Sequence, residues 1–291
     1  MRKLLLQLDS SPHPSVFDRV VALDGGADEV LSYGGVTDDA VRDLVHGAIF
    51  TRGPKHLHNT AIFIGGNDMV AGERLLAAVR KAFFGPMRVS VMLDSNGSNT
   101  TAVAAVAKLQ QAALPHGGLL GRRAVVTAST GPVGMRAAGL LAKAGADVIV
   151  TSRRPEGGAR AVSAIQQRFG ASVRAATMPD TLHAPAVLAA NGGAEVLLNA
   201  GGAGVHIVPR EAWAGRAGLL AAADVNAVPP LGIEGIEVTD DGVERDGVAV
   251  FGALGVGGLK MKLHKACIAR LFERNDLVLD AETIAEIARE L

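Results

Sequence analysis

A short glycine-bearing segment in the middle of the chain has the residue types of a pyrophosphate-binding turn. An apolar run at 124–127 is followed by Ala128-Ser129-Thr130-Gly131-Pro132-Val133-Gly134. If a strand passes into a helix here, the free N–H groups of the helix can bind a pyrophosphate. Gly131 would let the backbone approach it, and Gly134 would let helix and strand pack closely. We therefore expect cofactor contacts from Ser129, Thr130, Gly131, Pro132 and Val133.

This segment departs from the usual G-x-G-x-x-G pattern at its first position. Ser129 stands where the first glycine is usual, so a residue with a side chain must make the tight turn. A glycine-bearing turn between strand and helix also occurs in doubly wound folds that bind no dinucleotide. The motif alone does not separate the two interpretations.

The next apolar run, 147–151, ends in Ser152-Arg153-Arg154. NAD enzymes place an acidic side chain roughly 20 residues after the glycines, where it binds the ribose 2′-hydroxyl. This chain has a hydroxyl and two guanidinium groups instead, which can bind a 2′-phosphate. The pattern favours NADP, with NAD as the alternative cofactor. A solvated basic pair is the other interpretation.

A loop of small residues, Ala200-Gly201-Gly202-Ala203-Gly204, follows the apolar run 195–199. In a parallel sheet such a loop lies at the carboxyl edge, where a dinucleotide binds. The loop offers room for a nicotinamide ribose, or it is only a flexible turn. Ala200, Gly201 and Asn226 complete the predicted cofactor-binding residues.

These segments need a parallel α/β scaffold, and short β-type runs alternate with helical patterns along the chain. We predict strands at 3–8, 29–33, 60–64, 88–93, 124–127, 147–151, 172–176, 195–199 and 219–223. We predict helices at 15–23, 38–46, 69–83, 100–111, 133–144, 158–169, 181–190, 260–273 and 281–291. A glycine-rich stretch, 251–258, precedes the helix at 260–273.

The segment 114–121 carries proline and glycines between a helix and a strand, and is the predicted linker. The predicted fold is therefore α/β with two domains. An α/β substrate domain occupies 1–113, and a Rossmann-type doubly wound parallel sheet that binds NADP occupies 122–256. The C-terminal helices at 257–291 can pack back on the first domain.

The composition excludes several classes of partner. Lys plus Arg (29) balance Asp plus Glu (29), so no basic field exists to attract nucleic acid or an anionic membrane. No apolar stretch approaches the roughly 20 residues of a membrane-spanning helix, and the first residues read as a strand, not as a signal peptide. The single cysteine, Cys267, can form neither an internal disulfide nor a Cys-based zinc site. We expect a cytoplasmic protein without metal, nucleic-acid or membrane partner.

Long and distinctive sequence motifs are spread along nearly the whole chain. Two of them are Gly65-Gly66-Asn67-Asp68-Met69 and Asp94-Ser95-Asn96-Gly97-Ser98-Asn99. Further strings lie at 14–18, 24–28, 33–34, 51–53, 130–136, 229–233 and 251–264. Together they resemble the NAD(P)-dependent methylene-tetrahydromethanopterin dehydrogenases of methylotrophs, the type that also acts on methylene-tetrahydrofolate. The segment 240–246 and Ser129 depart from that pattern.

The resemblance implies hydride transfer from the N5,N10-methylene bridge of a reduced pterin to C4 of NADP, which gives the methenyl cation. No general base is obligatory, because the protein's main task is to position two rings face to face. The resemblance places the active-site lysine at Lys260. A solvated lysine at the start of a basic helix is the alternative. The resemblance also implies a homo-oligomer, a trimer.

The predicted pterin contacts are mostly polar. The segment 94–101 gathers short donors and acceptors between a strand and a helix, and we expect contacts from Asp94, Ser95, Asn96, Ser98, Asn99 and Thr100. The same residue types are ordinary turn and N-cap residues. Phe17 and Asp18 could supply a stacking face and an acceptor, although a helix-start aromatic also fits a core. Arg52 could meet an anionic tail or remain solvated.

Two other functions fit parts of the sequence. One is the same reaction with NAD and tetrahydrofolate as the main partners. The other is a non-catalytic nucleotide-binding sensor, motivated by Ser129. The Lys260 region and the pterin-side strings argue against a sensor, which would not need them. A cyclohydrolase side activity would require a positioned general base, and the sequence indicates none.

Overall fold

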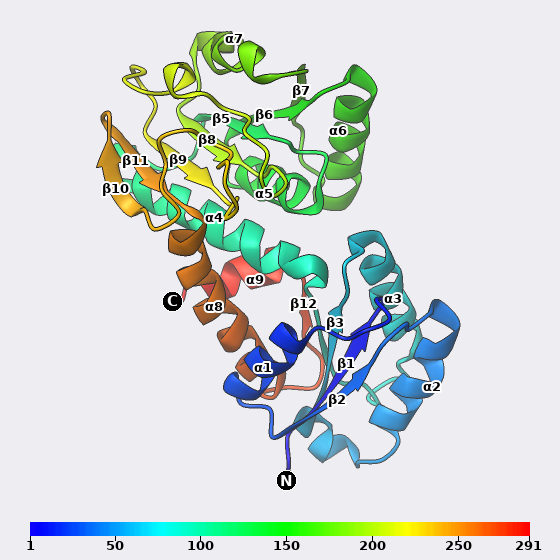
Figure 1. Ribbon diagram of the computed structural model, residues 1–291. Coiled ribbons are helices and arrows are strands. Elements are labelled where there is room, and N and C mark those ends of the chain that lie inside the picture. The colour runs from blue at the N-terminus through cyan, green and yellow to red at the C-terminus, as the bar shows by residue number, and fades with distance from the viewer. The chain divides into compact units, whose positions relative to one another are not determined.

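The computed structural model describes the whole chain, residues 1–291. It divides into two compact units (Figure 1): unit 1 is Met1–Thr100 with Met261–Leu291, and unit 2 is Thr101–Lys260. The unit boundaries fall within two helices, α4 (Ser98–Ala113) and α8 (Ala253–Leu271). The predicted linker at 114–121 lies inside unit 2 and begins with a short 3-10 helix, Leu114–His116.

Unit 1 is built on a parallel sheet with the strand order β12-β4-β3-β1-β2. The strands are β1 (Leu4–Asp9), β2 (Glu29–Tyr33), β3 (Thr60–Gly65), β4 (Ser90–Leu93) and β12 (Val278–Leu279). The helices are α1 (Val16–Asp24), α2 (Asp38–Ile49), α3 (Met69–Ala82) and α9 (Ala281–Ala288). In α2 the buried residues Val41, Val45 and Ala48 follow the helical period, so this face joins the core beside the sheet.

Unit 2 contains a larger sheet with the strand order β10-β11-β9-β8-β5-β6-β7. Its strands are β5 (Arg123–Thr127), β6 (Asp147–Ser152), β7 (Arg174–Thr177), β8 (Val196–Asn199), β9 (Ala221–Asp224), β10 (Asp241–Arg245) and β11 (Val248–Phe251). Only β10 runs antiparallel to its neighbour. The parallel α/β fold class that we predicted is therefore confirmed.

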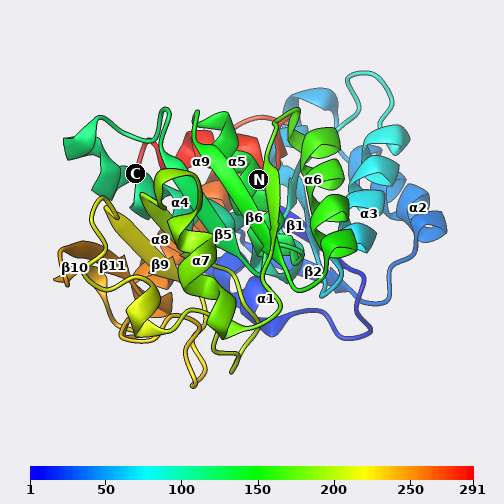
Figure 2. The ribbon, with the colours of Figure 1, turned by 90° about the horizontal axis from the view of Figure 1, so that it is seen from above.

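Helices cover both faces of this sheet. Helices α5 (Pro132–Lys143) and α6 (Pro155–Phe169) lie side by side against β5 and β6 (Figure 2). Figure 1 shows α7 (Ala184–Ala189) on the other side of the sheet from α5. There the buried Trp213 anchors the core, and its indole N–H donates to the carbonyl of Glu234 at 2.9 Å.

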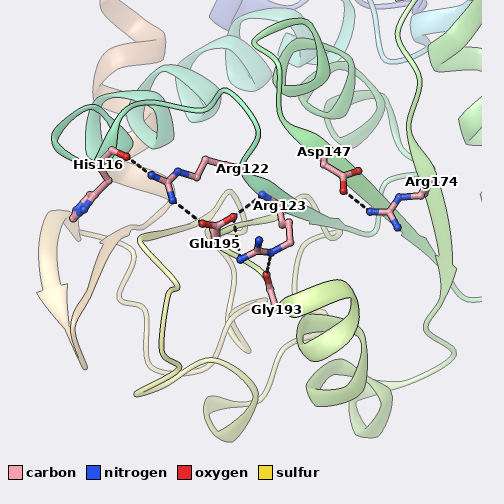
Figure 3. A network of polar contacts seen from close by, with 7 residues as sticks. All are labelled: His116, Arg122, Arg123, Asp147, Arg174, Gly193 and Glu195. Carbon is pink, nitrogen blue, oxygen red and sulfur yellow. Dashed lines mark hydrogen bonds and ion pairs between the residues drawn. The ribbon is translucent and has the colours of Figure 1, made fainter.

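Ion pairs hold the edge of this sheet at which the strands begin (Figure 3). Glu195, just before β8, accepts hydrogen bonds from the Arg122 guanidinium at 2.7 Å and from the backbone N–H of Arg123 at 3.0 Å. The Arg123 guanidinium lies 3.2 Å from the same carboxylate. Arg174 and Asp147 pair at 2.5 Å on the neighbouring strands β7 and β6. Glu195 is thus a structural residue at the amino end of β8.

The structure differs from the predicted elements mainly in the last third of the chain. Helix α8 begins at Ala253, so the glycine-rich stretch is largely helical. A Cβ at Gly255 would lie 2.1 Å from the carbonyl oxygen of Asp240, so this glycine lets the helix pack on another backbone segment. Strands β10, β11 and β12 are not among the predicted elements. Strand β10 is polar and exposed, β11 has only four residues, and β12 contains only Val278–Leu279.

None of the helices combines the length and the apolar character that a membrane crossing requires.

Candidate functional site

The predicted cofactor loops of unit 2 follow strands that end at one edge of the sheet. Thr127, the last residue of β5, is in register with Asn199, the last residue of β8, and Asn199 is in register with Asp224 of β9. The loop after β5 is also bonded to β6, because the backbone N–H of Ala128 donates to Thr151 Oγ1 at 3.2 Å. The structure therefore brings the segments 128–134, 152–154 and 200–204 together at the carboxyl edge.

The turn after β5 is made by Ala128, whose φ is +52°. Ser129 follows it and is completely buried. The Ser129 hydroxyl donates to the carbonyl of Val126 and accepts from the backbone N–H of Thr151 at 3.1 Å. The backbone N–H of Ser129 is also used within the fold, since it donates to the carbonyl of Thr151 at 3.2 Å. Thr130, the next residue, is exposed.

The two glycines of the turn serve different purposes. A Cβ at Gly134 would lie 2.7 Å from Ser129 Cα and 3.3 Å from Ala200 Cβ, so packing of α5 requires a glycine there. A Cβ at Gly131 would meet nothing nearer than the Ala128 carbonyl oxygen at 3.9 Å, and its φ of −84° suits any residue. The fold itself does not require a glycine at 131. The N–H of Gly131 makes only a long contact with the Ala128 carbonyl, at 3.5 Å, and the space beside its Cα is open.

The start of α5 is also suited to an anion. Gly131 is its N-cap, Pro132 follows in the first turn, and no side chain caps the helix. Uncapped N–H groups at a helix N-terminus attract anionic groups such as a pyrophosphate. The residues at this edge therefore fit a dinucleotide.

The residues predicted to bind the 2′-phosphate lie where β6 passes into α6. Ser152 is half-buried, and Arg153 and Arg154 are exposed. The Ser152 hydroxyl accepts a long hydrogen bond from the Arg154 N–H at 3.4 Å. A Cβ at Gly157 would lie 2.4 Å from Ser152 Oγ and 3.6 Å from Thr130 Cγ2, so the first turn of α6 packs against both loops.

Asn226 has a different environment from Ala200 and Gly201. Its Oδ1 accepts from the backbone N–H groups of Val228 at 2.9 Å and Gly204 at 3.4 Å. Its Nδ2 donates to the carbonyl of Pro230 at 3.2 Å. This 4 % exposed side chain holds the glycine loop to the segment after β9.

Sequence reasoning missed the strand-end residues Thr127, Asn199 and Asp224, which are buried and hydrogen-bonded to one another. Their signal was a polar residue that ends an apolar run in a parallel sheet. The observed register of the strands places them side by side.

In unit 1 the predicted pterin-contact segment mostly supports the backbone. Asp94 Oδ1 accepts from the N–H groups of Asn99 and Thr100 at 2.9 and 3.0 Å, and its Oδ2 accepts from the Thr100 hydroxyl at 2.6 Å. Ser95 and Ser98 donate to the carbonyls of Gly65 and Ser95, each at 2.7 Å. These residues are buried, and only Asn96 among the six is exposed.

Phe17 and Asp18 lie in the first turn of α1, close to the ends of β1 and β3. Phe17 is 51 % exposed, so it is not a core residue. Asp9, which the sequence analysis missed, ends β1 and accepts from the N–H groups of Ser11 at 2.7 Å and Ser15 at 3.1 Å. The Asp9 and Asp18 carboxylates lie 3.3 and 3.5 Å from the position of a Cβ on Gly65.

Arg52 is not brought to this edge. It lies between α2 and β3, where β3 begins, and its guanidinium donates to the carbonyl of Asn59 at 2.6 Å. Lys260 is half-buried within α8, not at its start. Burial raises the pKa of the Cys267 thiol to about 12, so it is no nucleophile at neutral pH. No group of His, Cys, Asp or Glu side chains is arranged to hold a metal ion.

Solved structures of low sequence identity share the fold. The chain aligns over 98 % of its length with shikimate 5-dehydrogenase from Listeria monocytogenes, covering 96 % of that chain with a TM-score of 0.54 and 14 % identity. It aligns over 100 % of its length with 5-ketofructose reductase from Gluconobacter sp. strain CHM43, covering 99 % of that chain with a TM-score of 0.53 and 15 % identity.

Proteins of higher identity give the family. Residues 16–96 match the family model described as methylene-tetrahydromethanopterin dehydrogenase, N-terminal. The bifunctional protein MdtA of Methylorubrum extorquens is 52 % identical over 291 residues, which cover 100 % of this chain and 99 % of that protein. The NAD(P)-dependent methylenetetrahydromethanopterin dehydrogenase of the same organism is 34 % identical over 299 residues, with 100 % and 99 % coverage. The chain therefore belongs to the methylene-tetrahydromethanopterin dehydrogenase family, as the strings in its sequence predict.

Proposed function

We propose that this protein is an oxidoreductase that transfers a hydride from N5,N10-methylene-tetrahydromethanopterin to NADP in one-carbon metabolism. The methylene carbon loses one hydrogen with two electrons and becomes the methenyl cation, and NADP becomes NADPH. The observation that carries the proposal is the full-length match, at 52 % identity, to a protein of this family.

The carboxyl edge of unit 2 would hold NADP. The open backbone at Gly131 and the uncapped start of α5 suit the pyrophosphate. Ser152, Arg153 and Arg154 suit the 2′-phosphate, because guanidinium groups bind phosphate oxygens in pairs. Ala200 and Gly201 lie at the same edge, next to the turn. A bound nicotinamide supplies the hydride acceptor at C4.

The carboxyl edge of unit 1 would hold the pterin. Its exposed members are Phe17, which offers a ring face, and Asn96, which offers an amide. The buried Asp94, Ser95, Ser98, Asn99 and Thr100 would act by fixing the turn that presents Asn96. Asp18 is the proposed acceptor for the ring, and Lys260 is the proposed catalytic side chain that orients the bridge nitrogens.

The finer assignments belong to the same proposal. Tetrahydromethanopterin is the proposed carrier, tetrahydrofolate is a second carrier to be tested, and NAD is the alternative cofactor. A homotrimer is the proposed assembly and the cytoplasm the proposed compartment.

A spectrophotometric assay tests the proposal directly. Purified protein is mixed with each methylene-pterin, and reduction of NADP and of NAD is followed in parallel. Turnover of methylene-tetrahydromethanopterin with NADP well above NAD is the expected result. Comparable rates with NAD would overturn the cofactor preference alone. NADP binding without turnover of either pterin would overturn the assignment as an oxidoreductase and favour a nucleotide sensor.

A further inference from the structure

A chain of buried polar side chains crosses the ends of three neighbouring strands in unit 2. The Thr127 hydroxyl at the end of β5 donates to Asn199 Oδ1 at 2.7 Å. Asn199 Nδ2 at the end of β8 donates to Asp224 Oδ1 at 2.8 Å at the end of β9. All three residues are at most 2 % exposed, so none of them can touch a cofactor.

The same atoms bind the backbone of the two loops that leave this edge. Asn199 Oδ1 also accepts from the N–H of Gly201 at 3.2 Å. Asp224 Oδ1 accepts from the N–H of Asn226 at 3.0 Å, and its Oδ2 accepts from the N–H of Ile233 at 2.9 Å. The network thus fixes the beginning of the loop 200–204 and both ends of the segment 226–233.

Close packing fixes the orientation of the Asn199 and Asp224 side chains. A Cβ at Gly232 would lie 1.8 Å from Asn199 Nδ2 and 2.9 Å from Asp224 Oδ1, so the segment after β9 rests directly on the two side chains. The Asn199 amide cannot be turned around, because its oxygen faces an N–H donor and its nitrogen faces a carboxylate. A buried carboxylate that accepts several N–H bonds is costly to alter.

We infer that Asn199 and Asp224 are positioning residues for hydride transfer. Their hydrogen bonds hold the loop 200–204 and the segment 226–233, which would lie beside the nicotinamide half of the cofactor. This inference rests on the proposed function. The adenine half is assigned to different residues, Ser152 to Arg154, on another loop. Disturbing the network should therefore slow the chemical step more than it weakens cofactor binding.

The polarity of the Asn199–Asp224 pair offers a sharp test. Asn199→Asp sets two carboxylates against each other, and Asp224→Asn sets an amide N–H against an N–H donor. The double variant Asn199→Asp/Asp224→Asn restores a hydrogen bond between the two side chains and keeps acceptors for Gly201 and Ile233. Only the N–H of Asn226 loses its partner. Such a cycle separates a paired interaction from two independent losses.

The kinetic experiment compares kcat, the KM for NADP, and the isotope effect with substrate deuterated at the methylene carbon. Each single variant should lose about 30-fold or more in kcat, because a misplacement of the reacting groups by about 1 Å costs up to about 100-fold. The KM for NADP should stay within about 3-fold, and the isotope effect on kcat should increase. The double variant should recover kcat relative to Asn199→Asp, because a hydrogen bond between carboxylate and amide replaces two opposed carboxylates. A kcat in the double variant no higher than that of Asn199→Asp would overturn the inference.

Glu195→Gln is the matched control, because Glu195 precedes β8 and Asn199 ends it. This variant loses stability at the other edge and should keep the wild-type kcat and isotope effect. If both single variants are insoluble, Thr127→Val replaces them, since it removes one hydrogen bond to Asn199 and keeps the shape. Thr127→Val should still lower kcat about 10-fold, and an unchanged kcat would overturn the inference.

A second readout needs no substrate. Amide hydrogen exchange of the cofactor-free protein should be about 10-fold faster or more in Asp224→Asn at Asn226 or at Ile233, whichever N–H faces the new amide NH2. Exchange at both positions should be unchanged in Glu195→Gln. Unchanged exchange in Asp224→Asn would overturn the inference whatever the enzyme does. Absence of wild-type turnover would overturn the proposed function alone, and the exchange rates would still decide whether the network orders the loops.

Discussion

The Ser129 hydroxyl accepts a hydrogen bond from the backbone N–H of Thr151 at 3.1 Å, and so joins the turn after β5 to the next strand. The same hydroxyl donates to the carbonyl of Val126. A serine at the first position of the glycine motif is therefore part of the fold, and the left-handed conformation falls on Ala128 instead. This arrangement removes the main argument for a degenerate, non-catalytic nucleotide site.

Ser129→Gly is expected to lower the free energy of unfolding, although it restores the usual glycine at the first position of the motif. The N–H of Thr151 would lose its buried acceptor, which costs about 1–3 kcal/mol in the free energy of unfolding. Denaturant unfolding measures the loss, and Ser129→Ala is the control that removes the hydroxyl without adding backbone freedom. A Ser129→Gly protein as stable as wild type, with tighter NADP binding, would contradict this role.

Gly131→Ala and Gly134→Ala should separate cofactor binding from stability. Gly131→Ala has open space, so its free energy of unfolding should change by less than about 1 kcal/mol, while the KM for NADP rises about 10-fold or more because the methyl group blocks the pyrophosphate. Gly134→Ala should destabilise by about 1–3 kcal/mol, since its Cβ would overlap Ser129. Denaturant unfolding measures the stability of both variants, and steady-state kinetics measure their KM for NADP. An unchanged KM in Gly131→Ala would refute the assignment of Gly131 to the pyrophosphate.

The sequence predicted the parallel α/β fold because apolar runs and helical patterns alternate regularly up to about β9. It could not predict that β12 joins the sheet of unit 1, because that pairing joins Val278 and Leu279 to β4, and the whole of unit 2 lies between them in the sequence. Likewise, Asp94 to Thr100 have the residue types of a binding loop and of a helix cap. Only the hydrogen bonds of Asp94 with Asn99 and Thr100 show that the cap is formed.

Arg153→Ser should lower kcat/KM for NADP and leave kcat/KM for NAD nearly unchanged. A charged hydrogen bond to phosphate contributes about 1.5–3 kcal/mol, which corresponds to a loss of about 10- to 100-fold. The control is Arg168→Ser, because Arg168 lies at the far end of α6, about 20 Å along the helix. Parallel kinetics with both cofactors give the answer. Equal losses with NADP and NAD would mean that Arg153 does not contact the 2′-phosphate.

Glu195 should make the stability of unit 2 depend on pH. Burial alone would raise the pKa of its carboxyl, but the Arg123 N–H, the Arg122 guanidinium and the charges of both arginines hold that pKa below its usual 4.5. A carboxyl with a lowered folded pKa stabilises the protein above its unfolded pKa, and this contribution is lost as the pH falls through the folded pKa.

Glu195→Gln should therefore lower the free energy of unfolding by about 2 kcal/mol at neutral pH, because it removes the charge from a nearly buried ion pair. The difference from wild type should shrink steadily as the pH falls below about 4.5, where the unfolded chain takes up the proton. Urea unfolding of both proteins from neutral pH down to the acid limit of folding measures this dependence. The more exposed pair Arg274–Asp276 supplies the control. The hydrogen bonds from Arg274 also lower the pKa of Asp276, so Asp276→Asn should change in the same direction with pH but cost less than about 1 kcal/mol. A Glu195→Gln difference that stays constant on acidification would show that the side chain contributes by shape and hydrogen bonding, and not by its charge.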